Sequence, residues 1–128
     1  MYKDNKIIIH RYASGIDPYY IEAVVTFVGQ NISVTIGGGS KYHIGAIAIA
    51  IPSDSIINPG QITVSTSVIT VMGHKDDVLA KDVATKLAKH FNTTVTVTAG
   101  VHVDSADSVD IETLLTNSNL LVDKIIQD

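Results

Sequence analysis

The 128 residues of this chain are enough for one domain with a buried core and too few for two, so we expect a single domain over residues 1–128. Hydrophobic residues make up 45% of the chain and charged residues 17%, which is typical of a globular protein rather than a disordered one. The formal net charge is −4 and Lys and Arg do not cluster, which argues against nucleic-acid binding because phosphates require a basic surface.

Two further features of the composition narrow the class of protein. The chain contains no cysteine, so a disulfide framework, a thiolate metal site and a cysteine nucleophile are all excluded. No apolar stretch reaches the roughly 20 residues that span a bilayer, and the opening residues do not have the pattern of a secretory signal. We therefore expect a cytoplasmic protein without a membrane segment.

The first 71 residues have the pattern of β-strands separated by turns. Between residues 32 and 36, apolar and polar side chains alternate, which places the apolar ones on one face of a strand. The predicted strands are residues 6–13, 20–28, 32–36, 44–51 and 62–71, with a hairpin at 29–31, a glycine loop at 37–39 and a loop at 52–61. Ala46, Ala48 and Ala50 form a face of small side chains on which a helix could pack closely.

The apolar period then changes to that of a helix. Leu79, Val83, Leu87 and Phe91 recur at every fourth residue, which predicts an amphipathic helix over residues 76–91. Residues 94–99 return to strand alternation, and Ser108 is the expected N-cap of a last helical region that breaks or kinks at residues 117–119. The predicted fold class is α/β in the broad sense (α+β): a mostly antiparallel meander of five to six strands, one β-α-β crossover and a C-terminal helical cap.

Three histidines, each in a glycine-marked segment, are expected to meet at one edge of this sheet. Strands 62–71 and 94–99 flank a crossover helix and therefore run parallel, so that the segments following them, with His74 and His102, lie at the same edge. An antiparallel strand 44–51 would begin at that edge, next to His43. In open α/β sheets, ligands bind outside the carboxyl ends of the strands.

The glycine run allows two interpretations. Gly37, Gly38 and Gly39 can form a flexible hairpin turn, which is the commoner use of such a run. They can also form a backbone-amide cradle for a phosphate or carboxylate. The segment matches neither of the common nucleotide-binding glycine patterns, so the alternatives stay open.

The segment Gly73, His74, Lys75, Asp76, Asp77 lies between a strand and a helix. The two aspartates are explained at least as well by ordinary helix initiation, because acidic side chains are favoured in a first turn. His74 and Lys75 are not needed for that purpose. Together with free N–H groups at a helix start, they are suited to binding an anion.

The segment that contains His102 and Asp104 could be a solvated strand end. Because the two residues are two positions apart, their side chains would point to the same face of a strand that continued this far. Asp104 could then orient His102 as an acid, a base or a metal ligand. His43, His74 and His102 together are also a plausible ligand set for a divalent metal.

Taken together, the patterns GGGxxxHIG, GHKDD and GxHxD resemble the LpdD-like family. This family comprises the small D-type subunits of bacterial hydroxyarylic-acid (gallate-type) decarboxylase systems and is described as prenylated-flavin chaperones. The resemblance implies an accessory protein that holds prenylated flavin mononucleotide, or FMN, and delivers it to a UbiD-like decarboxylase, whose catalytic subunit is the implied partner. Carried over by position, the family's marked residues are Gly37, Gly38, Gly39, His43, Gly73, His74, Lys75, Asp76, His102 and Asp104.

Three functions follow from these residues. In the first, which we favour, the glycine loop, the N–H groups after Gly73 and Lys75 hold the phosphate of a planar cofactor, while the three histidines contact its rings. In the second, His43, His74 and His102 bind a divalent metal of a small enzyme, with Asp104 or Asp76 as orienting group or base. In the third, the chain is a purely structural partner subunit. An exposed first strand would also permit a homo-oligomer through edge pairing.

Overall fold

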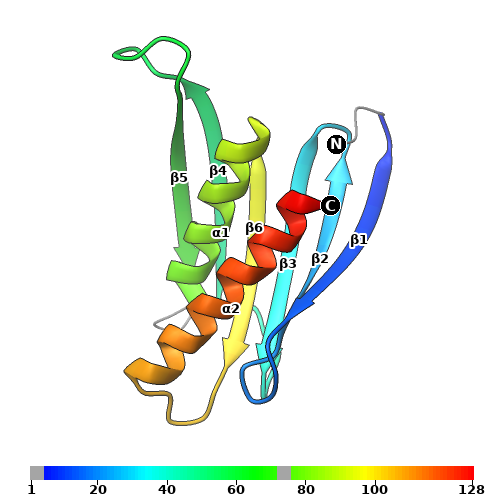
Figure 1. Ribbon diagram of the computed structural model, residues 1–128, viewed down its shortest axis with the longest axis vertical. Coiled ribbons are helices and arrows are strands. Elements are labelled where there is room, and N and C mark those ends of the chain that lie inside the picture. The colour runs from blue at the N-terminus through cyan, green and yellow to red at the C-terminus, as the bar shows by residue number, and fades with distance from the viewer. Residues whose placement is uncertain (1–4, 72–75) are drawn as a thin grey trace.

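The computed structural model describes residues 5–71 and 76–128 of the chain. Six strands form one mixed sheet, and two helices lie on the same face of it (Figure 1). The strands are β1 (Ile7–Ser14), β2 (Ile21–Val28), β3 (Asn31–Gly39), β4 (Ala46–Asp54), β5 (Ile62–Thr70) and β6 (Val95–His102), and the helices are α1 (Asp76–Phe91) and α2 (Ser108–Gln127). The predicted α+β class is confirmed. None of the helices in these described ranges is both long and apolar enough to cross a membrane.

The order of the strands is β1-β2-β3-β6-β4-β5, which corrects the predicted five-stranded meander. Strand β6 inserts between β3 and β4; it runs parallel to β3 and antiparallel to β4. Because β5 is also antiparallel to β4, β5 and β6 run in the same direction, as the crossover through α1 requires. The carboxyl ends of β3, β5 and β6 and the start of β4 therefore lie at one edge of the sheet, the lower one in Figure 1.

Side-chain alternation divides the sheet into a buried face under the helices and an open face. Ala46, Ala48 and Ala50 are fully buried, and β4 is the strand that α1 contacts most extensively, so the predicted close packing is confirmed. The isoleucines that alternate with them lie on the open face, and Ile49 is the least exposed of the three at 37%. Alanine lets the helix axis approach the sheet, and β-branched neighbours support the extended backbone.

Two strands are longer than expected. The glycine run, predicted as a loop, is the end of β3: Gly37 pairs with Gly100, and Gly39 pairs with His102 of β6. Strand β4 continues through Pro52, which was expected to begin a loop. It pairs with β6 only as far as Ala50, so the missing N–H of Pro52 costs no bond on that side.

Helix α2 corrects two further predictions. Its N-cap is Asp107 rather than Ser108, because Asp107 and Asp110 each accept the other's backbone N–H in a capping box. The helix runs unbroken through residues 117–119. Asn117 donates to the carbonyl oxygen of Tyr19 at 2.9 Å, Asn119 accepts from Lys86 at 2.6 Å, and Ser118 is buried. The two asparagines thus make tertiary hydrogen bonds instead of breaking the helix.

Candidate functional site

The site begins at the sheet edge where β4 leaves β6. The last ladder pair between these strands is Ala46 with Ala99, and the N–H of Gly45 still donates to the carbonyl oxygen of Ala99 at 2.9 Å. Residues 40–45, which we call the 40–45 loop, then turn away across the open face. From Gly100 onward, β6 therefore has no β4 backbone beside it.

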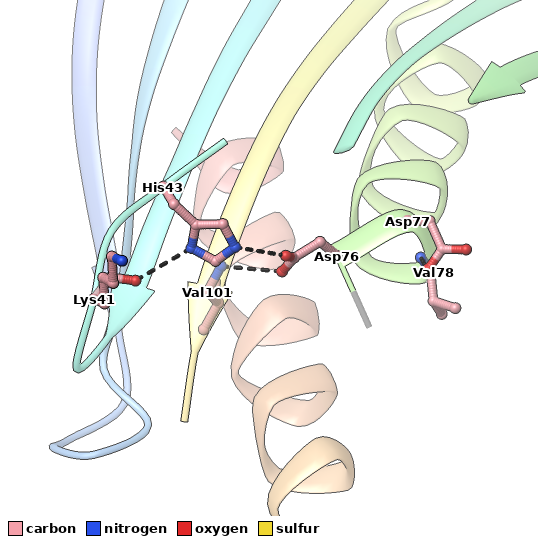
Figure 2. Close-up of polar contacts among 6 residues, drawn as sticks. All are labelled: Lys41, His43, Asp76, Asp77, Val78 and Val101. Atoms are coloured by element: carbon pink, nitrogen blue, oxygen red, sulfur yellow. Dashed lines mark hydrogen bonds and ion pairs between the residues drawn. The ribbon is translucent and has the colours of Figure 1, made fainter. Parts of the chain in front are cut away.

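Asp76 supplies the hydrogen-bond acceptor that β4 would have provided if it continued beside β6. Its carboxylate accepts the N–H of Val101 at 3.0 Å through one oxygen and contacts Nε2 of His43 at 3.0 Å through the other (Figure 2). Asp76 is the first residue of α1 and only 1% exposed. The carboxylate thus joins the helix start, the end of β6 and the 40–45 loop, and it also lies where the helix dipole favours a negative charge.

Glycine is required at position 45 for this arrangement. A Cβ there would overlap the carboxylate of Asp76 and lie 2.7 Å from its Cγ. The glycine therefore lets the loop backbone lie against the buried carboxylate, a function that the sequence pattern did not reveal.

Both ring nitrogens of His43 face oxygen atoms of the protein. Nε2 faces Asp76, and Nδ1 lies 3.3 Å from the carbonyl oxygen of Lys41 (Figure 2). Because both partners are acceptors, both contacts are hydrogen bonds only when both nitrogens carry a proton. His43 therefore helps to hold its own loop in position.

His102 lies beside His43 and is more accessible. The two ring centroids are 6.5 Å apart in an edge-to-face arrangement, so the predicted meeting of these two histidines is observed. Nε2 of His102 lies 2.8 Å from the carboxylate of Asp104, the contact that their spacing in the sequence predicted. The side chains of His102 and Asp104 are 44% and 85% exposed, so this pair faces solvent.

The 40–45 loop packs directly on the glycines of this edge. At Gly37 a Cβ would lie 2.6 Å from the ring of Tyr42, and at Gly100 it would overlap the carbonyl group of His43. The N–H of Gly39 donates to Tyr20 and that of Ser40 to His102, so neither amide is free for an anion. The glycine run thus packs against the chain itself, and in this arrangement the cradle interpretation lacks the amide of Gly39.

The ring of Tyr42 packs on Gly37, and its hydroxyl donates a hydrogen bond to Glu22 of β2 at 2.7 Å. The hydrogen bond to Glu22, together with desolvation and the negative charge of that carboxylate, raises the pKa of Tyr42 to about 12. The neutral phenol is therefore the form that the folded protein favours.

We expect Tyr42 to ionise about two pH units above its usual value, near pH 12 instead of 10. Because the pKa is raised in the folded state, this contact stabilises the fold fully below pH 10 and loses its contribution as the pH rises towards 12. Near-ultraviolet absorbance titration measures the ionisation. In Glu22→Gln the ionisation near pH 12 should move back towards pH 10, and in Tyr42→Phe it should disappear. An ionisation near pH 12 that persists in Tyr42→Phe would belong to another tyrosine.

A cavity of about 380 Å³ opens on the sheet's open face beside the 40–45 loop. Its lining comes from β1, β2, β3 and the loop, and consists of Arg11, Glu22, Val24, Thr35, Ile36, Gly37, Tyr42 and His43. The sequence interpretation named only Gly37 and His43 of these residues. Arg11 could have been found from its alternation with Ile7 and Ile9, which places it on the open face.

A second hollow, of about 500 Å³, lies between α1 and α2 and contains none of the predicted site residues. Its lining includes Lys86, which is already bonded to Asp82 and Asn119, and His90, in the last turn of α1. We therefore take the cavity beside the 40–45 loop as the candidate site.

The predicted site residues thus divide into two groups. The structure brings together Gly37, Gly38 and Gly39, His43, Asp76, His102 and Asp104 at one edge. Gly73, His74 and Lys75 lie outside the described residues. Within residues 5–71 and 76–128, no three His, Asp or Glu side chains gather as a metal site would need. The three-histidine metal set, which includes His74, stays an untested alternative.

Comparison with known proteins gives a family match and matches among solved structures. Residues 15–128 match the model of a family described as the prenylated flavin chaperone LpdD-like domain. No curated protein matches the chain in sequence. Among solved structures, a chain from the crystal structure of a novel chaperone complex for yeast 20S proteasome assembly has a similar fold. Its TM-score is 0.59 at 19% identity, over 94% of this chain and 93% of that one, so the likeness concerns the fold alone.

Proposed function

The chain belongs to the LpdD-like family of prenylated flavin chaperones, and from this premise we propose that it binds prenylated flavin mononucleotide beside the 40–45 loop. We further propose that it delivers this cofactor to a UbiD-like hydroxyarylic-acid decarboxylase. In this proposal the chain is an accessory protein and catalyses no step itself.

The observation that carries the proposal is the cavity lined by Arg11, Tyr42 and His43. Its volume of about 380 Å³ is in the range of small-molecule sites, roughly 300–1,000 Å³. The open face around it offers an aromatic ring at Tyr42 and an aliphatic side chain at Val24 to a planar ring system.

Arg11 is the group that we assign to the phosphate. It is exposed, lines the cavity, and makes no ion pair with any residue in the described ranges. The one carboxylate of the lining, Glu22, already accepts the hydroxyl of Tyr42. A guanidinium fork is suited to a phosphate because it can donate two parallel hydrogen bonds. His102, 6.5 Å from His43, would contact the exposed edge of the ring system.

We expect Arg11→Ala to weaken binding of FMN and prenylated FMN roughly tenfold or more. A hydrogen bond to a charged group contributes about 1.5–3 kcal/mol, and about 1.4 kcal/mol corresponds to a tenfold change in affinity. Flavin fluorescence and absorbance titrations measure the dissociation constants.

Riboflavin and His90→Ala provide the matched controls. Riboflavin lacks the phosphate, so its affinity should not change in Arg11→Ala, and His90→Ala removes an imidazole that lies away from the site. No detectable binding of either phosphorylated flavin at high micromolar concentration would refute the proposal. Equal losses for FMN and riboflavin would refute the role of Arg11.

Delivery needs its own measurement. Loaded protein mixed with a cofactor-free UbiD-like decarboxylase should restore decarboxylation faster than the same amount of free prenylated FMN. Equal rates would mean that the chain only stores the cofactor.

A further inference from the structure

Strand β5 forms an open edge of the sheet. It pairs with β4 on one side, and no strand in the described part of the chain pairs with the other side. In Figure 1 it is the outermost strand beside α1. Its outer backbone groups are therefore available to another strand.

The register identifies these groups. Just beyond the two ends of β5, the carbonyl oxygen of Gln61 and the N–H of Val71 bond to Ser55 and Gly45, on the β4 side. Because backbone direction alternates along a strand, odd-numbered residues of β5 point towards β4. The N–H and C=O groups of Ile62, Val64, Thr66, Val68 and Thr70 consequently point outward.

This edge lacks the features that usually prevent strand pairing. Soluble proteins protect edges with charges, proline, bulges or very short strands. The nine residues of β5, ITVSTSVIT, contain no charged residue, proline or glycine. The opposite edge strand, β1, carries His10 and Arg11, so the bare edge is specific to β5.

We propose that β5 pairs antiparallel with β5 of a second copy of this chain, which joins two sheets into one. The register that pairs all nine residues sets Thr66 opposite its own symmetry mate and Ser65 opposite Ser67. It also sets Val64 opposite Val68, an apolar β-branched pair on each side of the axis. A second copy is the favoured occupant because a twofold axis sets each strand against itself, and an uncharged strand meets no like charge there.

The test places charges at the two exposed serines. In Ser65→Lys/Ser67→Lys, each new lysine faces a lysine of the other copy, whereas in Ser65→Lys/Ser67→Glu each lysine faces a glutamate. Like charges on opposed strands cost up to about 1 kcal/mol for each pair, so two pairs should weaken the dimer roughly tenfold or more. The charge-matched variant should dimerise about as well as the unmodified protein.

Sedimentation over a concentration series measures the dimer dissociation constant of the unmodified protein and of each variant, and circular dichroism verifies that each variant is folded. The unmodified protein should sediment at twice the monomer mass. A protein that is monomeric at every concentration, as expected if this edge receives a segment of a different protein, would overturn the proposal. A dimer that the double lysine variant leaves intact would also overturn it, because the contact would then lie elsewhere.

Discussion

Replacing Asp76 with alanine is expected to lower the free energy of unfolding by about 3 kcal/mol, because an unsatisfied buried group costs about 1–3 kcal/mol and two partners lose their contact. Val101 lies beyond the last residue of β6 that pairs with β4, so its buried N–H would have no acceptor. Nε2 of His43 would also lose its acceptor. Urea unfolding followed by circular dichroism measures this change.

Asp77 and Gly45 offer the controls for this experiment. Asp77 is also in the first turn of α1, but among the described residues its carboxylate accepts only the N–H of its neighbour Val78, so Asp77→Ala should cost about 0.5 kcal/mol. Gly45→Ala should cost less in the Asp76→Ala background than in the unmodified protein, because the carboxylate that its Cβ would overlap has been removed. Equal losses from Asp76→Ala and Asp77→Ala would show that Asp76 is only a helix-start residue.

Much of the fold could be predicted because local periodicity depends on neighbouring residues. The helix at residues 76–91 has the predicted bounds, and the alanine face of β4 lies under it. The position of β6 could not be predicted in the same way. Its alternating threonines and valines suit any place in a sheet, and only long-range packing decides that it joins β3 rather than β5.

The candidate site was predictable to a similar extent. The convergence of His43 and His102 follows from strand direction alone, so it held even though the strand order was wrong. The family was recognised from the same segments, and the match over residues 15–128 confirms it. The use of Asp76 as a substitute strand partner depends on where β4 ends relative to β6, which no local pattern records.

Arg11 and Tyr42 were missed for a related reason. Arg11 lies on the edge strand β1 and reaches the site only because β1, β2 and β3 pair in one register. Tyr42 lies in the predicted glycine segment, but its role depends on the packing of its ring on Gly37 and on its hydrogen bond to Glu22, which no local pattern indicates. Sequence motifs therefore located the edge, and tertiary register determined which side chains line it.

The second large effect is expected at Gly100, where alanine should destabilise the protein by about 3 kcal/mol and also disturb the candidate site. Its Cβ would overlap the backbone carbonyl group of His43, which cannot rotate away as a side chain can. Overpacking of this kind costs about 1–3 kcal/mol, and the displaced loop would in addition weaken the contact between His43 and Asp76.

Gly37→Ala is the matched comparison, because Gly37 and Gly100 are paired across β3 and β6. At Gly37 the obstacle is the side chain of Tyr42, which is 51% exposed and can move at the expense of its hydrogen bond to Glu22, so that variant should lose about 1 kcal/mol. Urea unfolding measures both losses, and the ring-nitrogen NMR shifts of His43 should move in Gly100→Ala much more than in Gly37→Ala. If the two variants behaved alike, the 40–45 loop would be free to lift from the sheet. Its backbone would then not hold His43 in position, and the cavity beside it would not be preformed.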